Sequence, residues 1–138
     1  MPLFSLHSKE LLSQADIHLQ VLFTEVIKHR DCTILEAFRD EERQNKMFSI
    51  GTSKVKWPNG KHNVMPSEAV DVAPYFEKRG SISLEKYEVV EFGHYVLGVR
   101  DCLKLTNRIR WGGDWDKDWD IWDNSFDDLP HFELVNKL

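Results

Sequence analysis

The middle of the chain reads Lys61-His62-Asn63-Val64-Met65-Pro66-Ser67-Glu68-Ala69-Val70-Asp71. Eight residues stand between His62 and Asp71, and the Pro-Ser pair among them favours a turn. After this turn, residues 69–73 are apolar except for the acid, which predicts a strand that Pro74 should end. A carboxylate buried in such a strand needs a partner or a metal ion. The segment therefore predicts a turn that carries a histidine, followed by a strand that carries an acid.

A second group of ionisable residues lies near the C-terminus, in Asp128-Leu129-Pro130-His131-Phe132-Glu133. Residues 132–135 can form a last strand. Two imidazoles and one carboxylate are usual protein ligands of a catalytic zinc ion, which keeps its fourth position for water. We therefore expect the two segments to meet around one metal ion, with His62, Asp71 and His131 as its ligands. Taken singly, His62 could be an ordinary loop residue and Asp71 an outward-facing strand residue.

If these residues share a site, neighbouring polar residues take roles in peptide hydrolysis. Asp128 precedes His131 by three residues, so it can face the same pocket and act as the general base that takes a proton from water. Glu133 could support a metal ligand by a hydrogen bond, with a plain salt bridge as the alternative. Arg39 is the best candidate to stabilise a developing oxyanion, and Gln44 is a weaker one. The predicted catalytic residues are thus Asp128 and Arg39.

Composition and length limit the class of protein. With 138 residues, 41% of them hydrophobic and 30% charged, the chain has the size and balance of one soluble domain. A net charge of -5 argues against a nucleic-acid partner, and no apolar run reaches the ~20 residues of a membrane span. The N-terminus lacks the features of a signal peptide, so we expect synthesis in a cytoplasm. Cys32 and Cys102 fit no metal or redox spacing and are expected to be reduced core thiols, with a disulfide as the alternative.

Apolar periodicity and capping residues predict the remaining elements. Helices are expected at about residues 8–14, 16–28, 39–48 and 84–103, and further strands at 33–38 and 108–111. Ser8 and Asp40 are the expected N-caps, and Gly51 the expected C-cap. Because helices and strands alternate without a regular βαβ period, the sequence predicts an α+β fold with a small antiparallel sheet flanked by helices.

A loop rich in Asp and Trp follows residue 113. Its alternating acids resemble the start of a calcium loop: Asp114, Asp116, Asp118 and Asp120. The loop lacks the glycine and the final glutamate of an EF-hand, so a solvated acidic loop is favoured and a Ca²⁺ site is the alternative. Trp111 is expected in the core. Trp115 is expected at the rim of the cleft, where it would contact substrate.

Together these motifs resemble the zinc peptidoglycan peptidases of the D-Ala-D-Ala carboxypeptidase/VanY superfamily. The resemblance is strongest to the L-alanyl-D-glutamate endopeptidases found as phage endolysins and as related bacterial cell-wall enzymes. The matching residues span roughly 33 to 135 and are Phe38-Arg39, Gln44, Ser53-Lys54, Lys61-His62-Asn63, Pro66-Ser67, Ala69-Val70-Asp71-Val72-Ala73-Pro74, Trp111-Gly112-Gly113-Asp114-Trp115 and Asp128-Leu129-Pro130-His131-Phe132-Glu133.

The resemblance implies a fold of the Hedgehog/D-Ala-D-Ala peptidase type. It also implies that His62, Asp71 and His131 bind Zn²⁺ and that Asp128 is the base. Asp128 stands where the dipeptidase branch has Glu, and the gap between His62 and Asp71 is longer than in the short superfamily motif. Both departures fit the endopeptidase branch. Gln44 and Trp115 are the expected substrate-binding residues.

The implied activity is cleavage of the L-alanyl-D-glutamate bond in peptidoglycan, as in host lysis by an endolysin. We expect residues 1–138 to be a single catalytic domain without a wall-binding module, acting as a monomer and reaching the wall through a holin or a similar route. A D,D- or L,D-carboxypeptidase of the same superfamily is the alternative. Outside enzymes, the alternative is a degenerate zinc fold that serves as a binding module, although such a module would not need Asp128.

Overall fold

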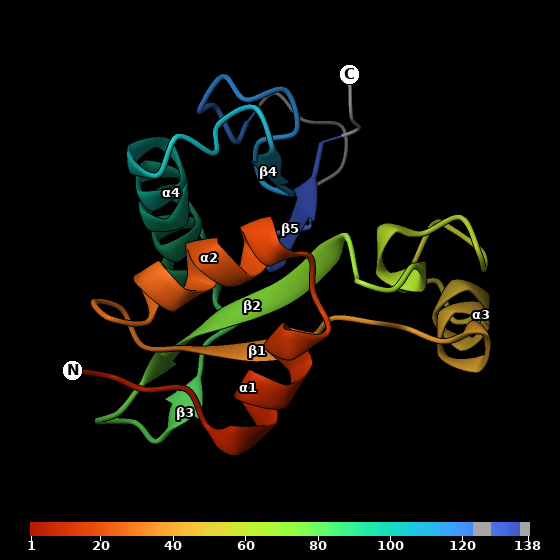
Figure 1. The fold of residues 1–138 in the computed structure, drawn as a ribbon, viewed down its shortest axis with the longest axis horizontal. Coiled ribbons are helices and arrows are strands. Elements are labelled where there is room, and N and C mark those ends of the chain that lie inside the picture. The colour runs from red at the N-terminus through yellow and green to blue at the C-terminus, as the bar shows by residue number, and fades with distance from the viewer. Residues whose placement is uncertain (123–127, 136–138) are drawn as a thin grey trace.

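One antiparallel sheet of five strands forms the frame of the protein in a computed structural model that describes residues 1–122 and 128–135 (Figure 1). The strands run in the order β1-β2-β5-β4, and β3 pairs with the far end of β2. Their bounds are β1 Cys32–Glu36, β2 Ala69–Phe76, β3 Ser81–Ile82, β4 Ile109–Trp111 and β5 His131–Leu134. The predicted α+β class with a small antiparallel sheet is confirmed.

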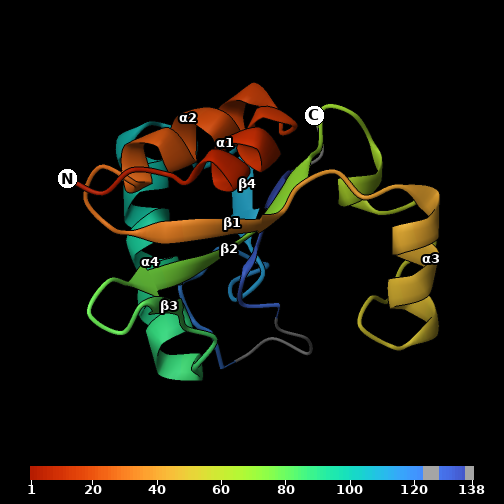
Figure 2. The same cartoon turned by 90° about the horizontal axis from the view of Figure 1, so that it is seen from below.

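In the described part of the chain, four α-helices accompany the sheet: α1 Leu6–Ser13, α2 Ile17–Val26, α3 Glu41–Ser49 and α4 Lys86–Cys102. Helices α1 and α2 lie over strands β1 and β2, and α4 packs against α2 and β2 (Figure 2). Helix α3 stands apart from the sheet, beside the short 3-10 turn η1, Lys61–Asn63 (Figure 1). The segment from α3 to η1 therefore forms one side of the molecule, next to the end of the sheet where β2 begins.

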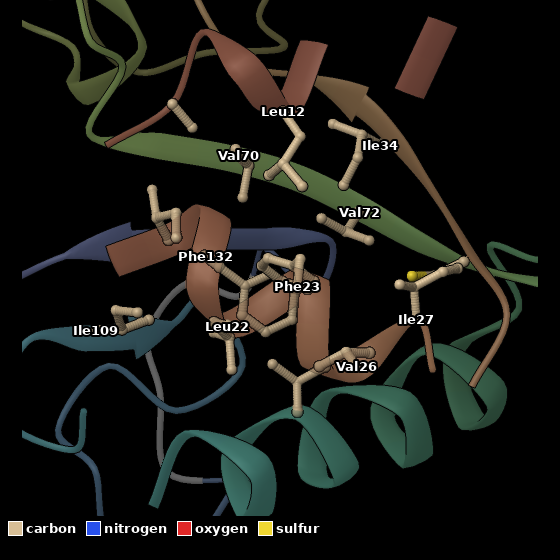
Figure 3. Packing of buried hydrophobic residues seen from close by; sticks show 14 of the residues in the cluster. Leu12, Leu22, Phe23, Val26, Ile27, Ile34, Val70, Val72, Ile109 and Phe132 are labelled. Atoms are coloured by element: carbon tan, nitrogen blue, oxygen red, sulfur yellow. The ribbon is translucent and has the colours of Figure 1, made fainter. Parts of the chain in front are cut away.

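The core forms where α2 presents one apolar stripe to the sheet (Figure 3). Leu19, Leu22, Phe23 and Val26 recur at helical spacing and are fully buried. Phe23 meets Phe132 edge to face, with ring centroids 5.2 Å apart. Each such side chain contributes roughly 1.5–3 kcal/mol on burial, so this packing fixes α2 against β5. The strands that carry the candidate site are thereby held on a rigid base.

One N-cap prediction and one strand-end prediction need correction. Ser5, not Ser8, caps α1, and its Oγ accepts a hydrogen bond from the Ser8 N–H. Ser8 is buried instead, and its Oγ accepts from Ile34 N, which ties α1 to β1. Pro74 does not end β2, which continues to Phe76. Proline has no N–H to donate, but the Pro74 carbonyl accepts a hydrogen bond from the Ser83 backbone N–H, so strand pairing continues past Pro74.

The two cysteines differ from the expected pair of core thiols. Both are free. Cys32 is buried on β1, and this burial raises the pKa of its thiol to about 12. Cys102 is exposed at the end of α4, so the prediction of a core position is wrong for this residue, which lies off the buried face of the helix. Within residues 1–122 and 128–135, every helix is too short or too polar to cross a membrane.

Candidate active site

The pairing of β2 with β5 places Asp71 directly opposite His131. The η1 turn adds His62, whose carbonyl accepts from the Arg39 N–H at 2.7 Å. His62 Nε2 then lies 3.3 Å from His131 Nδ1. Asp71 Oδ1 lies 3.1 Å from His131 Nδ1 and 3.4 Å from His62 Nε2. The three side chains that the sequence placed in two distant segments thus converge on one point.

The outer nitrogen of each imidazole has its own acceptor. His62 Nδ1 lies 2.6 Å from the Ala37 carbonyl, and His131 Nε2 lies 2.8 Å from Glu133 Oε1. These contacts assign the ring protons to the outer nitrogens, so in neutral rings both inner nitrogens present lone pairs toward Asp71. Three acceptors that meet in a buried place require a cation between them.

The spacing of these acceptors fits a metal ion. A tetrahedral zinc site with bonds of about 2.0–2.1 Å has ligand atoms about 3.3–3.4 Å apart. The separations of 3.1, 3.3 and 3.4 Å are close to that edge length. His62, Asp71 and His131 form one of two groups in the described residues whose ligand atoms all lie within 4.8 Å of one another. The donor set of two nitrogens and one oxygen suits zinc.

Without a metal ion, the site holds ionised groups, and a metal cation would take the place of their positive charge. Burial opposes ionisation of Asp71, but the hydrogen bonds to His131 and His62 hold its pKa well below the usual range. Burial likewise lowers the pKa of His131, but the hydrogen bonds to Asp71 and Glu133 outweigh it and raise that pKa to about 9. A proton therefore occupies the metal-free site at neutral pH, and a metal ion must displace it.

Arg39 is buried next to Asp71 and lines the same cavity as the three ligand candidates. Its Nη2 lies 3.3 Å from Asp71 Oδ2 and its Nη1 donates to Gln44 Oε1 at 3.1 Å. The Nε lies 2.9 Å from a Glu36 oxygen, but it lacks the alignment of a hydrogen bond. The guanidinium therefore contacts Asp71 Oδ2, whereas His131 contacts Oδ1. Its predicted role at an oxyanion stays a prediction.

Gln44 links Arg39 to the loop that follows α3. Its Oε1 also accepts from Asn63 Nδ2, and its Nε2 donates to Ser53 Oγ and to the Val55 carbonyl. Gln44 is fully buried and all of these bonds are internal. The side chain lines the cavity as a support of its wall, and its predicted contact with substrate stays a prediction.

Asp128 reaches the same point from the segment before β5. Its Oδ2 lies 3.9 Å from His131 Nδ1, and its side chain is 43% exposed. Burial and the nearby charge of Asp71 raise its pKa. The backbone is held by Gly112, whose carbonyl accepts from Asp128 N at 2.9 Å. A Cβ at Gly112 would meet the Asp128 carbonyl oxygen at 2.1 Å, so only glycine permits this approach.

These residues surround a cavity of about 380 Å³. Trp115 lies on its wall, with its ring centroid 5.8 Å from that of His131. The Arg110 guanidinium stacks over the Trp115 ring at 5.2 Å and donates to Glu133 Oε2. Trp111 is fully buried in the core, as predicted.

Three of these supporting groups were not predicted from the sequence. The Ala37 carbonyl carries no side-chain signal. Gly112 gives no indication of which backbone it approaches. Arg110 could have been found, because alternation along a strand sets it on the face opposite the buried Trp111.

Carboxylates of the acidic loop accept hydrogen bonds from backbone N–H groups of the same loop. Asp114 is buried, and its two oxygens accept from the backbone N–H groups of Asp118 and Trp119. Asp114, Asp116 and Asp118 form the second close acidic group in the described residues, which does not include Asp120. Asp120 instead accepts from Trp122 N. Backbone capping accounts for most of these contacts, and a Ca²⁺ role stays a prediction.

Comparisons with known proteins identify the family and the fold. The sequence matches the model of the phage L-alanyl-D-glutamate peptidase family over residues 3–135. The chain belongs to this family. Among solved structures, the L-Ala D-Glu endopeptidase ChiX of Serratia marcescens has the same fold, with a TM-score of 0.72 and 21% sequence identity over 96% of this chain and 90% of that chain. A comparison with curated proteins gives no match.

Membership of the phage L-alanyl-D-glutamate peptidase family makes this protein a peptidoglycan peptidase. The converging group of His62, Asp71 and His131 is consistent with a metal-dependent member of the family.

Proposed function

We propose that the protein is a zinc-dependent endopeptidase that hydrolyses the L-alanyl-D-glutamate bond of peptidoglycan stem peptides and so lyses a host cell. The observation that carries the proposal is the set of three acceptor atoms, 3.1–3.4 Å apart, contributed by His62, His131 and Asp71. The family match supports the choice of the L-alanyl-D-glutamate bond as the bond that is cleaved. The enzyme would be made in the host cytoplasm and act on the wall after release.

His62, Asp71 and His131 would hold the zinc ion, which when bound makes water more acidic and polarises a carbonyl group. Asp128 is the base, because its carboxylate faces the site at 3.9 Å from His131 Nδ1 without a hydrogen bond to it. Asp128 takes a proton from water as the water oxygen bonds to the alanyl carbonyl carbon. It returns the proton to the D-glutamyl nitrogen as the C–N bond breaks.

The remaining residues keep this arrangement rigid. Arg39 holds Asp71 in a fixed orientation and, at 6% exposure, also brings a positive charge to the wall of the cavity. Glu133 fixes the His131 ring through Nε2. Trp115 gives the substrate an apolar surface beside His131. Preorganised groups of this kind favour the transition state because they need not move as charge develops.

Mass spectrometry of digested peptidoglycan tests the proposal. We expect fragments with a new N-terminal D-glutamate, no fragments after treatment with a chelator, and recovery on addition of Zn²⁺. Release of free D-alanine would favour the carboxypeptidase alternative. Undiminished digestion by protein proved free of metal would refute the zinc mechanism.

A further inference from the structure

The cavity carries a positive charge that the whole chain does not. The chain has a net charge of -5. Seven charged side chains of the described residues line the cavity, four of them cationic: Arg39, Lys54, Lys61, Arg110, Asp71, Asp128 and Glu133. A divalent cation at the three ligand candidates would make the cavity more positive still. Such a field favours a substrate that bears negative charge near the scissile bond.

The two arginines among these cations differ in how many of their N–H groups the protein uses. Arg39 directs all three of its nitrogens toward protein groups. Lys61 donates to the Leu134 carbonyl. Arg110 is 36% exposed, and its Nε and Nη2 donate to a single oxygen of Glu133 at 3.1 and 3.0 Å. Within residues 1–122 and 128–135, its Nη1 has no hydrogen-bond partner, so three of its five N–H groups remain for a ligand, two on Nη1 and one on Nη2.

The position of Arg110 is fixed before substrate arrives. It pairs with Glu133 in the register of β4 and β5, and its guanidinium stacks on the Trp115 ring at 5.2 Å. The same ring lies 5.8 Å from that of His131. One aromatic ring therefore separates the guanidinium from a metal-ligand candidate. Arg110, Trp115 and His131 all line the same cavity, so a ligand at the metal-ligand candidates lies near the guanidinium.

The chemistry of the scissile bond supplies a matching group. D-glutamate forms this bond through its amino group and has two carboxyl groups. When the γ-carboxyl continues the stem peptide, the α-carboxyl stays on the carbon that carries the scissile nitrogen, as a free carboxylate or as an amide. Arginine binds carboxylates through paired N–H groups, and the amide offers one acceptor fewer and no charge.

We propose that Arg110, stacked on Trp115, binds the free carboxylate of the D-glutamate residue and makes the enzyme selective for stem peptides in which that carboxylate is not amidated. This inference rests on the proposed function. It adds a specificity-determining contact to the same site.

The test uses two synthetic stem peptides that differ only at that carboxyl group, one with the free carboxylate and one with the carboxamide. The zinc-loaded enzyme should cleave the carboxylate peptide with a kcat/KM about tenfold higher, the size expected for a charged hydrogen bond at a partly exposed site. Equal kcat/KM values would overturn the inference and leave the proposed function standing. Cleavage of neither peptide would overturn both.

Variants separate a substrate contact from an indirect effect through Glu133. Arg110→Gln should lower kcat/KM for the carboxylate peptide alone and so abolish the preference, and Arg110→Lys should restore part of it. Arg108→Gln, on an exposed neighbour outside the cavity, should leave both values unchanged. An equal fall for both peptides in Arg110→Gln would mean that Arg110 acts by positioning Glu133 and His131, and the inference would be wrong.

Discussion

Replacement of Asp128 by asparagine removes the proposed base and keeps the shape of the side chain. Asp128 Oδ2 lies 3.9 Å from His131 Nδ1, beyond hydrogen-bond distance, and the residue is not one of the three converging ligands. Zinc should therefore remain bound. Loss of a positioned general base typically slows a reaction 10²–10⁴-fold, or about 3–5 kcal/mol in the barrier. We expect kcat to fall in this range.

The fold should tolerate the change. The backbone of residue 128 is held by its N–H to the Gly112 carbonyl and by its own carbonyl to His131 N, and an asparagine keeps both bonds. With 43% of the side chain exposed, the free energy of unfolding should change by less than about 0.5 kcal/mol. A fall in activity would then report on chemistry, since neither metal content nor stability changes.

The assay follows new amino groups released from purified peptidoglycan, together with zinc content by elemental analysis and thermal unfolding. Glu10→Gln serves as the control, because Glu10 is an exposed acid on α1 outside the cavity and should leave the rate unchanged. Activity of Asp128→Asn within threefold of wild type, at full zinc occupancy, would refute the assignment of the base.

Three further predictions concern metal binding and packing. Glu133→Gln weakens the hold on the outer nitrogen of His131, so the Kd for zinc, measured by competition with a chelator, should rise about 10–100-fold; an unchanged Kd would show that Glu133 does not support the ligand. Burial lowers the pKa of His131, but hydrogen bonds to two carboxylates outweigh this effect and raise the pKa to about 9. A proton therefore competes with zinc for this histidine below pH 9. Zinc affinity should rise by up to about tenfold per pH unit toward pH 9, and a pH-independent Kd would contradict this. Gly93→Ala places a Cβ 2.2 Å from the Trp111 ring and should destabilise the protein by about 1–3 kcal/mol, whereas Gly98→Ala in the same helix has open space and should stabilise it by about 0.4–1 kcal/mol; similar melting temperatures for the two variants would argue against this packing.

The fold was predictable where local chemistry decides it. Asp40 caps α3, as its position before a run of charged helix formers indicated, because its side chain accepts from Arg43 N. The stripe on α2 is buried as its spacing predicted. Gly51 takes a positive φ of 83° after α3, which suits the expected glycine at this end of the helix.

The failures concern residues whose role depends on tertiary contacts. Ser8 fits an N-cap by type, yet Ser5 is better placed once α1 docks on β1, and Ser8 then bonds to Ile34. Strand β3 has only two residues and exists because β2 runs past Pro74. Such short elements have no periodicity from which they could be predicted.

In the candidate site, too, some features were predictable from the sequence and others were not. The meeting of His62, Asp71 and His131 was predictable, because each residue type has a chemistry that a plain loop or strand does not use. The support from the Ala37 carbonyl and from Gly112 was not, since it depends on backbone positions set by the fold. The contact between Arg39 and Asp71 spans 32 residues of sequence and follows from the register of β1 and β2.

A crystal structure with anomalous data collected at the zinc edge would test the central claim most directly. We predict one zinc ion bound through His62 Nε2, His131 Nδ1 and an Asp71 oxygen, at about 2.0–2.2 Å from each, with Asp128 close by and not coordinated. An ion bound through the outer nitrogen of either histidine, or three side chains that stay together in a fully active crystal without any metal, would contradict it.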